Sequence, residues 1–225
     1  MSKTLVITGA SRGIGYALAQ EAAKEGHIVY ALSRNLRTLD QTLLLKPVAI
    51  DITNHEALSK WTKQLHNKQV KVDALINNAG ALVNKSFRDT EHEDFEAIYR
   101  VNVFGLANIT RLLLPSIQPK GHVVNISSMG GIEKTAKFPG LAAYSSSKAA
   151  VNILTELLAE EYKSTGPAFN CLALGAVQTE MLSEAFPGFE APHTSTNMAS
   201  YILKFALNGQ HFFNGKIIPL ANSTP

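Results

Sequence analysis

Tyr144 and Lys148 are the two residues of this 225-residue chain whose types and spacing are best suited to chemistry. The segment that carries them is typical of a helix, and side chains four positions apart share a helix face, so the phenol and the ammonium point to one place. An isolated phenol has a pKa of about 10, and a nearby cation favours its ionised form. The pair is therefore suited to acid–base catalysis, although a half-buried Tyr and a surface Lys would show the same spacing.

Two serines come shortly before this pair. Ser127 and Ser128 follow a run that begins at Gly121 and is rich in β-branched residues, which predicts a strand. Ligands of open α/β sheets bind at the carboxyl edge of the strands, so either hydroxyl is a candidate site group.

A second informative stretch runs from Thr4 to Gly15. Leu5, Val6 and Ile7 form the continuous apolar run that a parallel strand covered on both faces requires. Gly9 allows a sharp turn, Gly13 keeps the backbone accessible to a ligand, and Gly15 lets the next helix lie close to the strand. The amides and the positive dipole end of that helix favour a pyrophosphate, although a glycine turn without a ligand has the same pattern.

The elements that must position these residues alternate between strand and helix. Further strands are predicted at His27–Ser33, Pro47–Ile52, Asp73–Ala79, Gly121–Ser127, Phe169–Ala176 and Lys216–Leu220, with helices at Ile14–Gly26, Thr90–Pro115, Ala142–Tyr162 and Asn197–Leu207. This pattern predicts one α/β domain over residues 1–225, a Rossmann-type, doubly wound parallel sheet of about seven strands with helices on both faces. Residues 180–196 lack a clear period and are expected to form a mobile substrate lid.

Composition excludes several other classes of protein. The net charge is +3 with basic and acidic residues interleaved, so nucleic acid is not expected as a partner. The lone Cys171 lies in an apolar run and is interpreted as a buried thiol, and the seven His residues have no metal-ligand spacing, so no metal is expected. No apolar stretch reaches the length of a membrane span, and we expect a soluble cytoplasmic protein.

Together these motifs resemble the short-chain dehydrogenase/reductase family. The chain has a T-G-x-x-x-G-x-G turn from Thr8 to Gly15 and an Asn77-Asn78-Ala79-Gly80 signature, and the Tyr144/Lys148 pair follows in the family's order. Asn102 falls inside a predicted helix, where Asn is a mediocre helix former, and it matches the family's catalytic asparagine. Of the two serines, Ser128 aligns with the catalytic position and Ser127 is the alternative.

The resemblance implies an oxidoreductase of the carbonyl reductase or alcohol dehydrogenase type, with hydride passing between a nicotinamide and a carbonyl carbon. Tyr144 would then give the carbonyl oxygen its proton, and Lys148 would lower the Tyr pKa and bind the nicotinamide ribose. Ser128 would donate to the developing oxyanion, and Asn102 would hold a water that connects Lys148 to solvent. A non-catalytic NADP(H)-binding sensor or scaffold protein is the alternative function.

The end of the second predicted strand carries Ser33 and Arg34 instead of the acidic residue that binds the ribose 2′-hydroxyl of NAD. Arg12 lies in the glycine turn, so two cations face the place of a 2′-phosphate, and NADP(H) is predicted over NAD(H). Both arginines could instead be ordinary surface residues. Asp51 and Ile52 are implied to contact the adenine ring, although Asp51 could equally serve the turn that follows it.

The complete predicted cofactor site is Gly9, Ser11, Arg12, Gly13, Ile14, Gly15, Ser33, Arg34, Asp51, Ile52, Asn78, Ala79, Gly80, Tyr144, Lys148, Gly175, Val177 and Thr179. The family usually has a Pro-Gly pair where this chain has Leu174-Gly175, which leaves the backbone there less defined. The loop between Ser128 and Tyr144 is also longer than usual, and could either shape the pocket or block it. Phe186 and Phe189 indicate an apolar substrate or pack against the protein itself.

The helices predicted at Thr90–Pro115 and Ala142–Tyr162 carry apolar residues beyond one narrow stripe. A helix that is apolar over a wide arc usually has a second neighbour, and family members commonly pair these two helices across a two-fold axis. The sequence therefore predicts a homodimer or homotetramer that acts on a small carbonyl or alcohol substrate.

Overall fold

The computed structural model describes residues 1–36 and 38–221, and it confirms the predicted Rossmann-type fold. A seven-stranded parallel sheet has the order β3-β2-β1-β4-β5-β6-β9. The elements are β1 (Thr4–Thr8), α1 (Gly13–Lys24), β2 (Ile28–Ser33), β3 (Leu45–Ala49), α2 (His55–Asn67), β4 (Val72–Asn77), α3 (His92–Tyr99), α4 (Leu106–Leu113), β5 (Ile117–Ser128), α5 (Ala142–Glu161), β6 (Ala168–Leu174), β7 (Val177–Gln178), α6 (Glu180–Ala185), β8 (His193–Thr194), α7 (Ser195–Asn208) and β9 (Ile217–Leu220).

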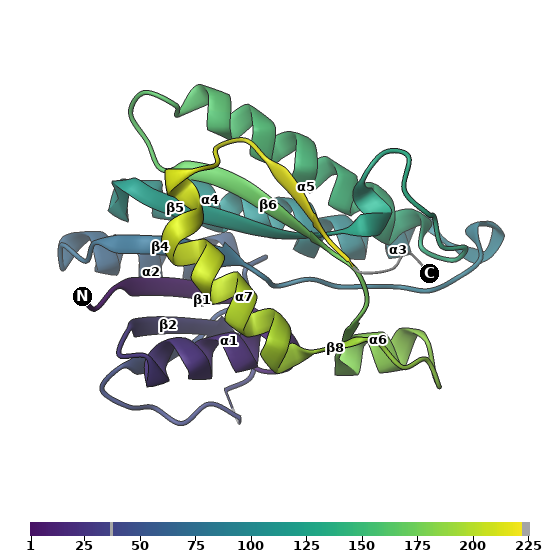
Figure 1. The fold of residues 1–225 in the computed structure, drawn as a ribbon, viewed down its shortest axis with the longest axis horizontal. Coiled ribbons are helices and arrows are strands. Elements are labelled where there is room, and N and C mark those ends of the chain that lie inside the picture. Colours follow the sequence, from purple (N-terminus) through teal and green to yellow (C-terminus); the bar gives the residue numbers. More distant parts are fainter. Residues whose placement is uncertain (37, 222–225) are drawn as a thin grey trace.

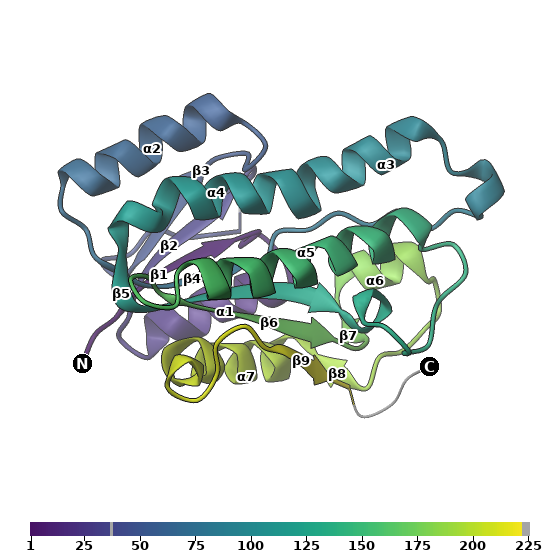
Figure 2. The ribbon, with the colours of Figure 1, turned by 90° about the horizontal axis from the view of Figure 1, so that it is seen from above.

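The helices cover both faces of the sheet (Figure 1). Figure 2 shows α1 and α7 on one face and α2, α4 and α5 on the other. The side chains of β1 alternate between these two layers, because successive residues of a strand point to opposite faces. Leu5 and Ile7 join the core under α1 and α7, whereas Val6 joins the core that includes Leu58 of α2 and Ile109 of α4. All five are fully buried, which explains why β1 has no polar face.

Several strand boundaries differ from the sequence prediction; β4 ends at Asn77 instead of Ala79, and β5 begins at Ile117 instead of Gly121. β3 spans Leu45–Ala49 instead of Pro47–Ile52, because Leu45 already pairs with Val29 of β2. The chain leaves the sheet after Ala49 and turns at Asp51. β6 ends at Leu174, two residues earlier than predicted.

The long helix predicted from Thr90 to Pro115 is interrupted. α3 and α4 are separated by a π-helical stretch, Arg100–Gly105, that contains Asn102. Gly105 permits close packing here, since a Cβ on it would lie 2.9 Å from two side-chain carbons of Ile52. Helical periodicity continues across such a bulge, so the residue pattern does not reveal it. π-Bulges are uncommon and are frequently found at functional sites.

A buried network of amides and hydroxyls joins the middle of the sheet to its helices. Asn77 Nδ2 donates to Thr110 Oγ1 at 2.9 Å and to Asn125 Oδ1 at 2.8 Å, and Asn125 Nδ2 donates to Thr155 Oγ1 at 2.8 Å. These residues belong to β4, β5, α4 and α5. Because buried polar groups destabilise a core unless they are paired, the network fixes the relative positions of these four elements.

The segment predicted as a lid contains the short helix α6 and the β8 strand, which pairs with β7 beside the carboxyl edge of the sheet. Figure 2 shows α6 beyond the ends of the strands and near the start of α5. Within the described residues, no helix is both long and apolar enough to span a membrane.

Candidate active site

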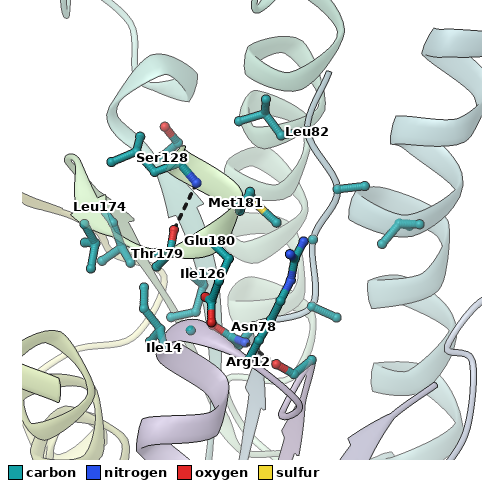
Figure 3. A pocket seen from close by; sticks show the side chains of 18 of the residues that line it. Arg12, Ile14, Asn78, Leu82, Ile126, Ser128, Leu174, Thr179, Glu180 and Met181 are labelled. Atoms are coloured by element: carbon teal, nitrogen blue, oxygen red, sulfur yellow. Dashed lines mark hydrogen bonds between the residues drawn. The ribbon is translucent and has the colours of Figure 1, made fainter. Parts of the chain in front are cut away.

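The predicted site residues come together because most of them follow directly after a strand of the parallel sheet. They line one pocket of about 510 Å³ at the carboxyl edge. Its wall includes all of the predicted cofactor residues except Gly15, and it includes Ser128. Asn102 does not line it. Figure 3 shows Arg12, Ile14 and Asn78 toward one end of this pocket and Ser128 and Leu82 toward the other.

The glycine turn between β1 and α1 has the geometry that the sequence predicts. Gly9 and Gly13 have φ values of +68° and +56°, which side chains rarely tolerate. A Cβ on Gly15 would lie 2.3 Å from the carbonyl oxygen of Gly9, so only glycine allows α1 to approach this closely. The N-cap residue Arg12 makes no side-chain hydrogen bond to the first turn of α1, and that turn contains no acidic residue. The start of α1 therefore fits a phosphate group.

The Asn77-Asn78-Ala79-Gly80 signature holds this turn in place, as predicted from the tendency of Asn side chains to bind backbone. Asn78 Nδ2 donates to the carbonyl oxygens of Thr8 and Gly9, at 3.0 and 3.2 Å. In return, the Thr8 hydroxyl oxygen accepts from the amides of Asn78 and Ala79, at 3.1 and 3.0 Å. Four hydrogen bonds thus tie the end of β1 to the end of β4.

Tyr144 and Lys148 both face the pocket from the first turns of α5. Lys148 Nζ lies 5.7 Å from the centre of the Tyr144 ring and donates to the carbonyl oxygen of Ile126 at 2.9 Å. Ser128 ends β5 beside Tyr144, with which it shares a hydrogen bond, and its Oγ accepts from the amide of Gly130 at 3.2 Å. Ser127 is 3% exposed and its hydroxyl donates to the backbone carbonyl of Lys148, so Ser128 is the better placed of the two serines.

The ionisation of this pair differs from the prediction. Burial raises the pKa of Tyr144 to about 12, and a hydrogen bond with Ser128 offsets only part of that rise. Burial also lowers the pKa of Lys148 to about 8. The expected depression of the Tyr144 pKa by Lys148 is therefore absent in the nucleotide-free protein. The physical reason is that the phenol is desolvated while the ammonium is hydrogen-bonded to Ile126 instead.

Asn102 lies behind the pocket wall and is completely buried. Its Nδ2 donates to Ala81 O and to Ser147 Oγ, both at 2.9 Å, and its Oδ1 accepts from Ala81 N at 2.8 Å. Both of its N–H donors are thus used by the protein. The immediate role of the side chain is to fix the segment after Gly80 against α5, and only its carbonyl oxygen retains capacity for the predicted water.

The two arginines predicted to face a 2′-phosphate are in different situations. Arg34 is exposed at the pocket wall, next to Ser33. Arg12 forms a two-point contact with Glu184 of α6, at 2.5 and 3.3 Å. This carboxylate raises the pKa of Arg12, and the guanidinium lowers the pKa of Glu184. Because the partners are about half and two-thirds exposed, the ion pair is weak and a phosphate could replace Glu184.

Two other predicted cofactor residues also have local structural roles. Asp51 Oδ1 accepts from the amide and the hydroxyl of Thr53, both at 2.8 Å, which is the turn-forming alternative considered from the sequence. Thr179 Oγ1 accepts from the amide of Leu182 at 3.2 Å and so caps α6. Both residues still line the pocket.

Sequence reasoning missed part of the pocket wall. The missed residues are mostly apolar and come from α6 and from the segments that follow β4 and β5; they include Leu82, Met129, Phe138, Leu141, Met181 and Leu182. The position of Leu82 directly after the Asn77–Gly80 signature was the available signal. The long loop before Tyr144 contributes Phe138 and Leu141 to the wall and leaves the pocket open, so it shapes the pocket and does not block it. Among the residues described, no cluster of His, Cys, Asp or Glu could hold a metal ion.

A parallel sheet with this strand order and a phosphate-accommodating turn after β1 defines a Rossmann-type, dinucleotide-binding class of protein. Residues 3–188 match the sequence model of the family described as short chain dehydrogenase. The oxidoreductase BOA17 of Botryotinia fuckeliana is 32% identical over 206 residues, covering 87% of this chain and 74% of that protein. The chain belongs to the short-chain dehydrogenase family.

Solved structures agree with this fold. A 4-hydroxyisoleucine dehydrogenase complexed with NADH has a TM-score of 0.87 and 26% identity, covering 99% of this chain and 98% of that one. A short-chain dehydrogenase from Burkholderia cenocepacia in complex with NADP has a TM-score of 0.86, with 99% and 97% coverage, and at 21% identity supports the fold alone. Family membership identifies an oxidoreductase that acts on CH–OH or C=O groups.

Proposed function

We propose that this protein is an NADP(H)-dependent carbonyl reductase or alcohol dehydrogenase in which Tyr144 is the general acid and base. The observation that carries the proposal is the meeting of Tyr144, Lys148 and Ser128 in the pocket that begins at the glycine turn. When bound, the nicotinamide supplies or accepts the hydride at the carbonyl carbon. The chain's own residues position the substrate oxygen and move one proton.

In the direction of reduction, Tyr144 gives its phenolic proton to the carbonyl oxygen as that oxygen gains negative charge. Ser128 lies beside Tyr144 and donates a hydrogen bond to the same oxygen. A phenol with a pKa of about 12 holds its proton at neutral pH, so a proton is present to donate but the acid is weak, and almost none of the phenolate that the reverse reaction needs as a base is formed. A positive charge close to the ring lowers that pKa, which is what Lys148 does once its ammonium is oriented toward the phenol.

The residues of the pocket wall are assigned to three parts of the dinucleotide. Gly13, Ile14 and the start of α1 hold the pyrophosphate, and Ile52 and Ala79 border the adenosine part of the pocket. Lys148 binds the nicotinamide ribose. A Cβ on Gly80 would lie 3.6 Å from Lys148 Nζ, so the glycine leaves the approach to the ammonium open. Gly175, Val177 and Thr179 border the nicotinamide end.

The preference for NADP(H) rests on Arg34, Ser33 and Arg12. No carboxylate stands at the end of β2 to repel a 2′-phosphate. One hydrogen bond to a charged group contributes about 1.5 to 3 kcal/mol, which corresponds to roughly ten- to a hundredfold in affinity. Arg12 adds to this only if it releases Glu184.

We also propose a homodimer or homotetramer in which the α4 and α5 faces meet. Phe104, in the π-helical stretch that leads into α4, and Ile153 and Leu157 of α5 are 64%, 58% and 61% exposed. Large apolar side chains that gather on one face of a folded chain usually mark a contact with another chain.

Incubation with NADPH and a panel of aldehydes, ketones and quinones tests the enzymatic proposal. We expect NADPH consumption with at least one carbonyl compound. Tyr144→Phe should bind NADPH normally and lose roughly 10² to 10⁴ in rate, because only the proton donor is removed. Tyr162→Phe, at the far end of α5, is the matched control and should retain the wild-type rate. NADPH binding without turnover of any compound would instead indicate the non-catalytic sensor or scaffold.

A further inference from the structure

Three segments that are far apart in the sequence are joined above the catalytic end of the pocket. They are residues 81–86 after β4, residues 132–141 before α5, and helix α6. Asn84 Nδ2 donates to Ala185 O at 2.8 Å, which links the first segment to α6. The amide of Lys85 donates to Gly140 O at 3.0 Å, which links it to the second segment. These three segments are called the roof below.

The roof contributes apolar side chains to the pocket. Leu82 comes from the first segment, Phe138 and Leu141 come from the second, and Met181, Leu182 and Phe186 come from α6. Figure 3 shows Leu82 and Met181 toward the same end of the pocket as Ser128. The surface nearest the catalytic hydroxyls is therefore hydrocarbon and thioether.

The charged residues of the pocket wall are Arg12, Arg34, Asp51, Lys148 and Glu180. A Cβ on Gly13 would lie 3.5 Å from Glu180 Oε2, so Glu180 is at the glycine turn, as is Arg12. Arg34 and Asp51 follow β2 and β3. Lys148 is 4% exposed and bonded to Ile126 O. Four of the five lie outside the roof; the fifth, Glu180, is the first residue of α6, and its carboxylate lies beside the glycine turn.

The lysines of the roof segments already have protein partners. Lys85 Nζ contacts both carboxylate oxygens of Asp94, at 2.9 and 2.7 Å. Lys137 Nζ donates to Ile132 O and to Thr135 Oγ1. Lys134 Nζ lies 3.7 Å from Glu133. Among the described roof residues, no cation is placed to receive a carboxylate or a phosphate on a substrate.

We propose that the roof is the substrate subsite and that it takes an uncharged, predominantly apolar carbonyl compound. This inference rests on the proposed function, because it assumes that a carbonyl group is presented to Tyr144 and Ser128. An apolar body would displace water from Leu82, Phe138, Leu141, Met181 and Phe186, which is favourable. A carboxylate in the same place would lose its hydration without gaining a partner.

The test uses matched carbonyl compounds that differ only in charge. The first pair is methyl 4-formylbenzoate and 4-formylbenzoate, and the second is 2-nonanone and 8-oxononanoate. We expect kcat/KM with NADPH to be at least about tenfold higher for the uncharged member, since an unpaired buried charge is strongly disfavoured. Calorimetric titration of each compound into the protein–NADPH complex should give the same order of affinities.

Substitutions of Phe186 test whether the preference for uncharged compounds arises in the roof. Phe186→Ala should lower kcat/KM for the uncharged compounds by about tenfold, mainly through KM, because it removes apolar contact without touching the catalytic hydroxyls. Phe186→Arg should raise the relative rate of the carboxylates. Phe212→Ala is the matched control, since Phe212 is 81% exposed and lies outside the pocket wall.

A carboxylate that reacts or binds as well as its uncharged partner overturns this inference and leaves the proposed function intact. Absence of turnover for every carbonyl compound, with NADPH bound, refutes the proposed function instead. In that case the calorimetric comparison still decides the subsite, because equal affinities for the two members of a pair would refute it.

Discussion

Lys148→Met should stabilise the nucleotide-free protein even though it removes a residue needed for activity. Lys148 is 4% exposed, its ammonium donates to the carbonyl oxygen of Ile126, and Cys171 interacts with it electrostatically. Burial lowers its pKa from 10.5 to about 8. That fall corresponds to about 3 kcal/mol of unfavourable free energy for holding the charged form in the folded protein. Methionine has similar length and carries no charge.

The loss of the hydrogen bond to Ile126 offsets about 1 kcal/mol of this gain. The net effect at pH 7 is therefore an increase of about 2 kcal/mol in the free energy of unfolding, or roughly 4 to 8 °C in Tm for a domain of this size. Lys60→Met, on the exposed side of α2, is the matched control and should change stability by less than about 0.5 kcal/mol.

The pH dependence gives the sharper check. Between pH 8 and 10.5 the folded protein has lost the Lys148 proton and the unfolded chain still binds it, so wild-type stability gains from this group as pH rises. Lys148→Met lacks that gain. Urea unfolding at a series of pH values should show the advantage of the variant in full below pH 8 and reversed, by about 1 kcal/mol, at pH 10.5, because the penalty for the buried charge has then gone while the variant still lacks the hydrogen bond to Ile126. A variant that is less stable than wild type at pH 7, or whose advantage does not shrink with pH, would refute the reasoning.

Three further outcomes can be measured directly. Glu184→Gln frees Arg12 and should tighten NADPH binding by about two- to fivefold, with a smaller effect on NADH, as followed by nucleotide fluorescence. Equal changes for both nucleotides would show that Arg12 does not reach the 2′-phosphate. Arg34→Asp should weaken NADPH by roughly ten- to a hundredfold and leave NADH unchanged or improved; wild-type protein that binds both equally contradicts the assignment. Leu157→Glu should shift the assembly toward monomer in light scattering, and a monomeric wild type at micromolar concentration would exclude the proposed interface.

The sequence determined those features that depend on neighbouring residues in the chain. The apolar run of β1 and the glycines after it encode a turn, and the turn has the expected geometry because backbone conformation is set locally. The spacing of Tyr144 and Lys148 placed both on one face of α5 for the same reason. The polarity of Asn102 within a helical segment marked that residue as unusual, but it did not predict the π-helical bulge around it.

Tertiary structure decided how these groups are partnered. Arg12 meets Glu184, which is 172 residues later in the chain, and nothing in either local sequence encodes that contact. The packing of α5 decided which of the two serines is available to the site, because the hydroxyl of Ser127 donates to the backbone of α5. Attraction between a phenolate and an ammonium would lower the pKa of Tyr144 and raise that of Lys148. The pKa of Tyr144 is instead raised and that of Lys148 is lowered, because burial of both side chains outweighs their attraction. Burial is a property of the whole sheet and its helices, so no spacing rule could supply it.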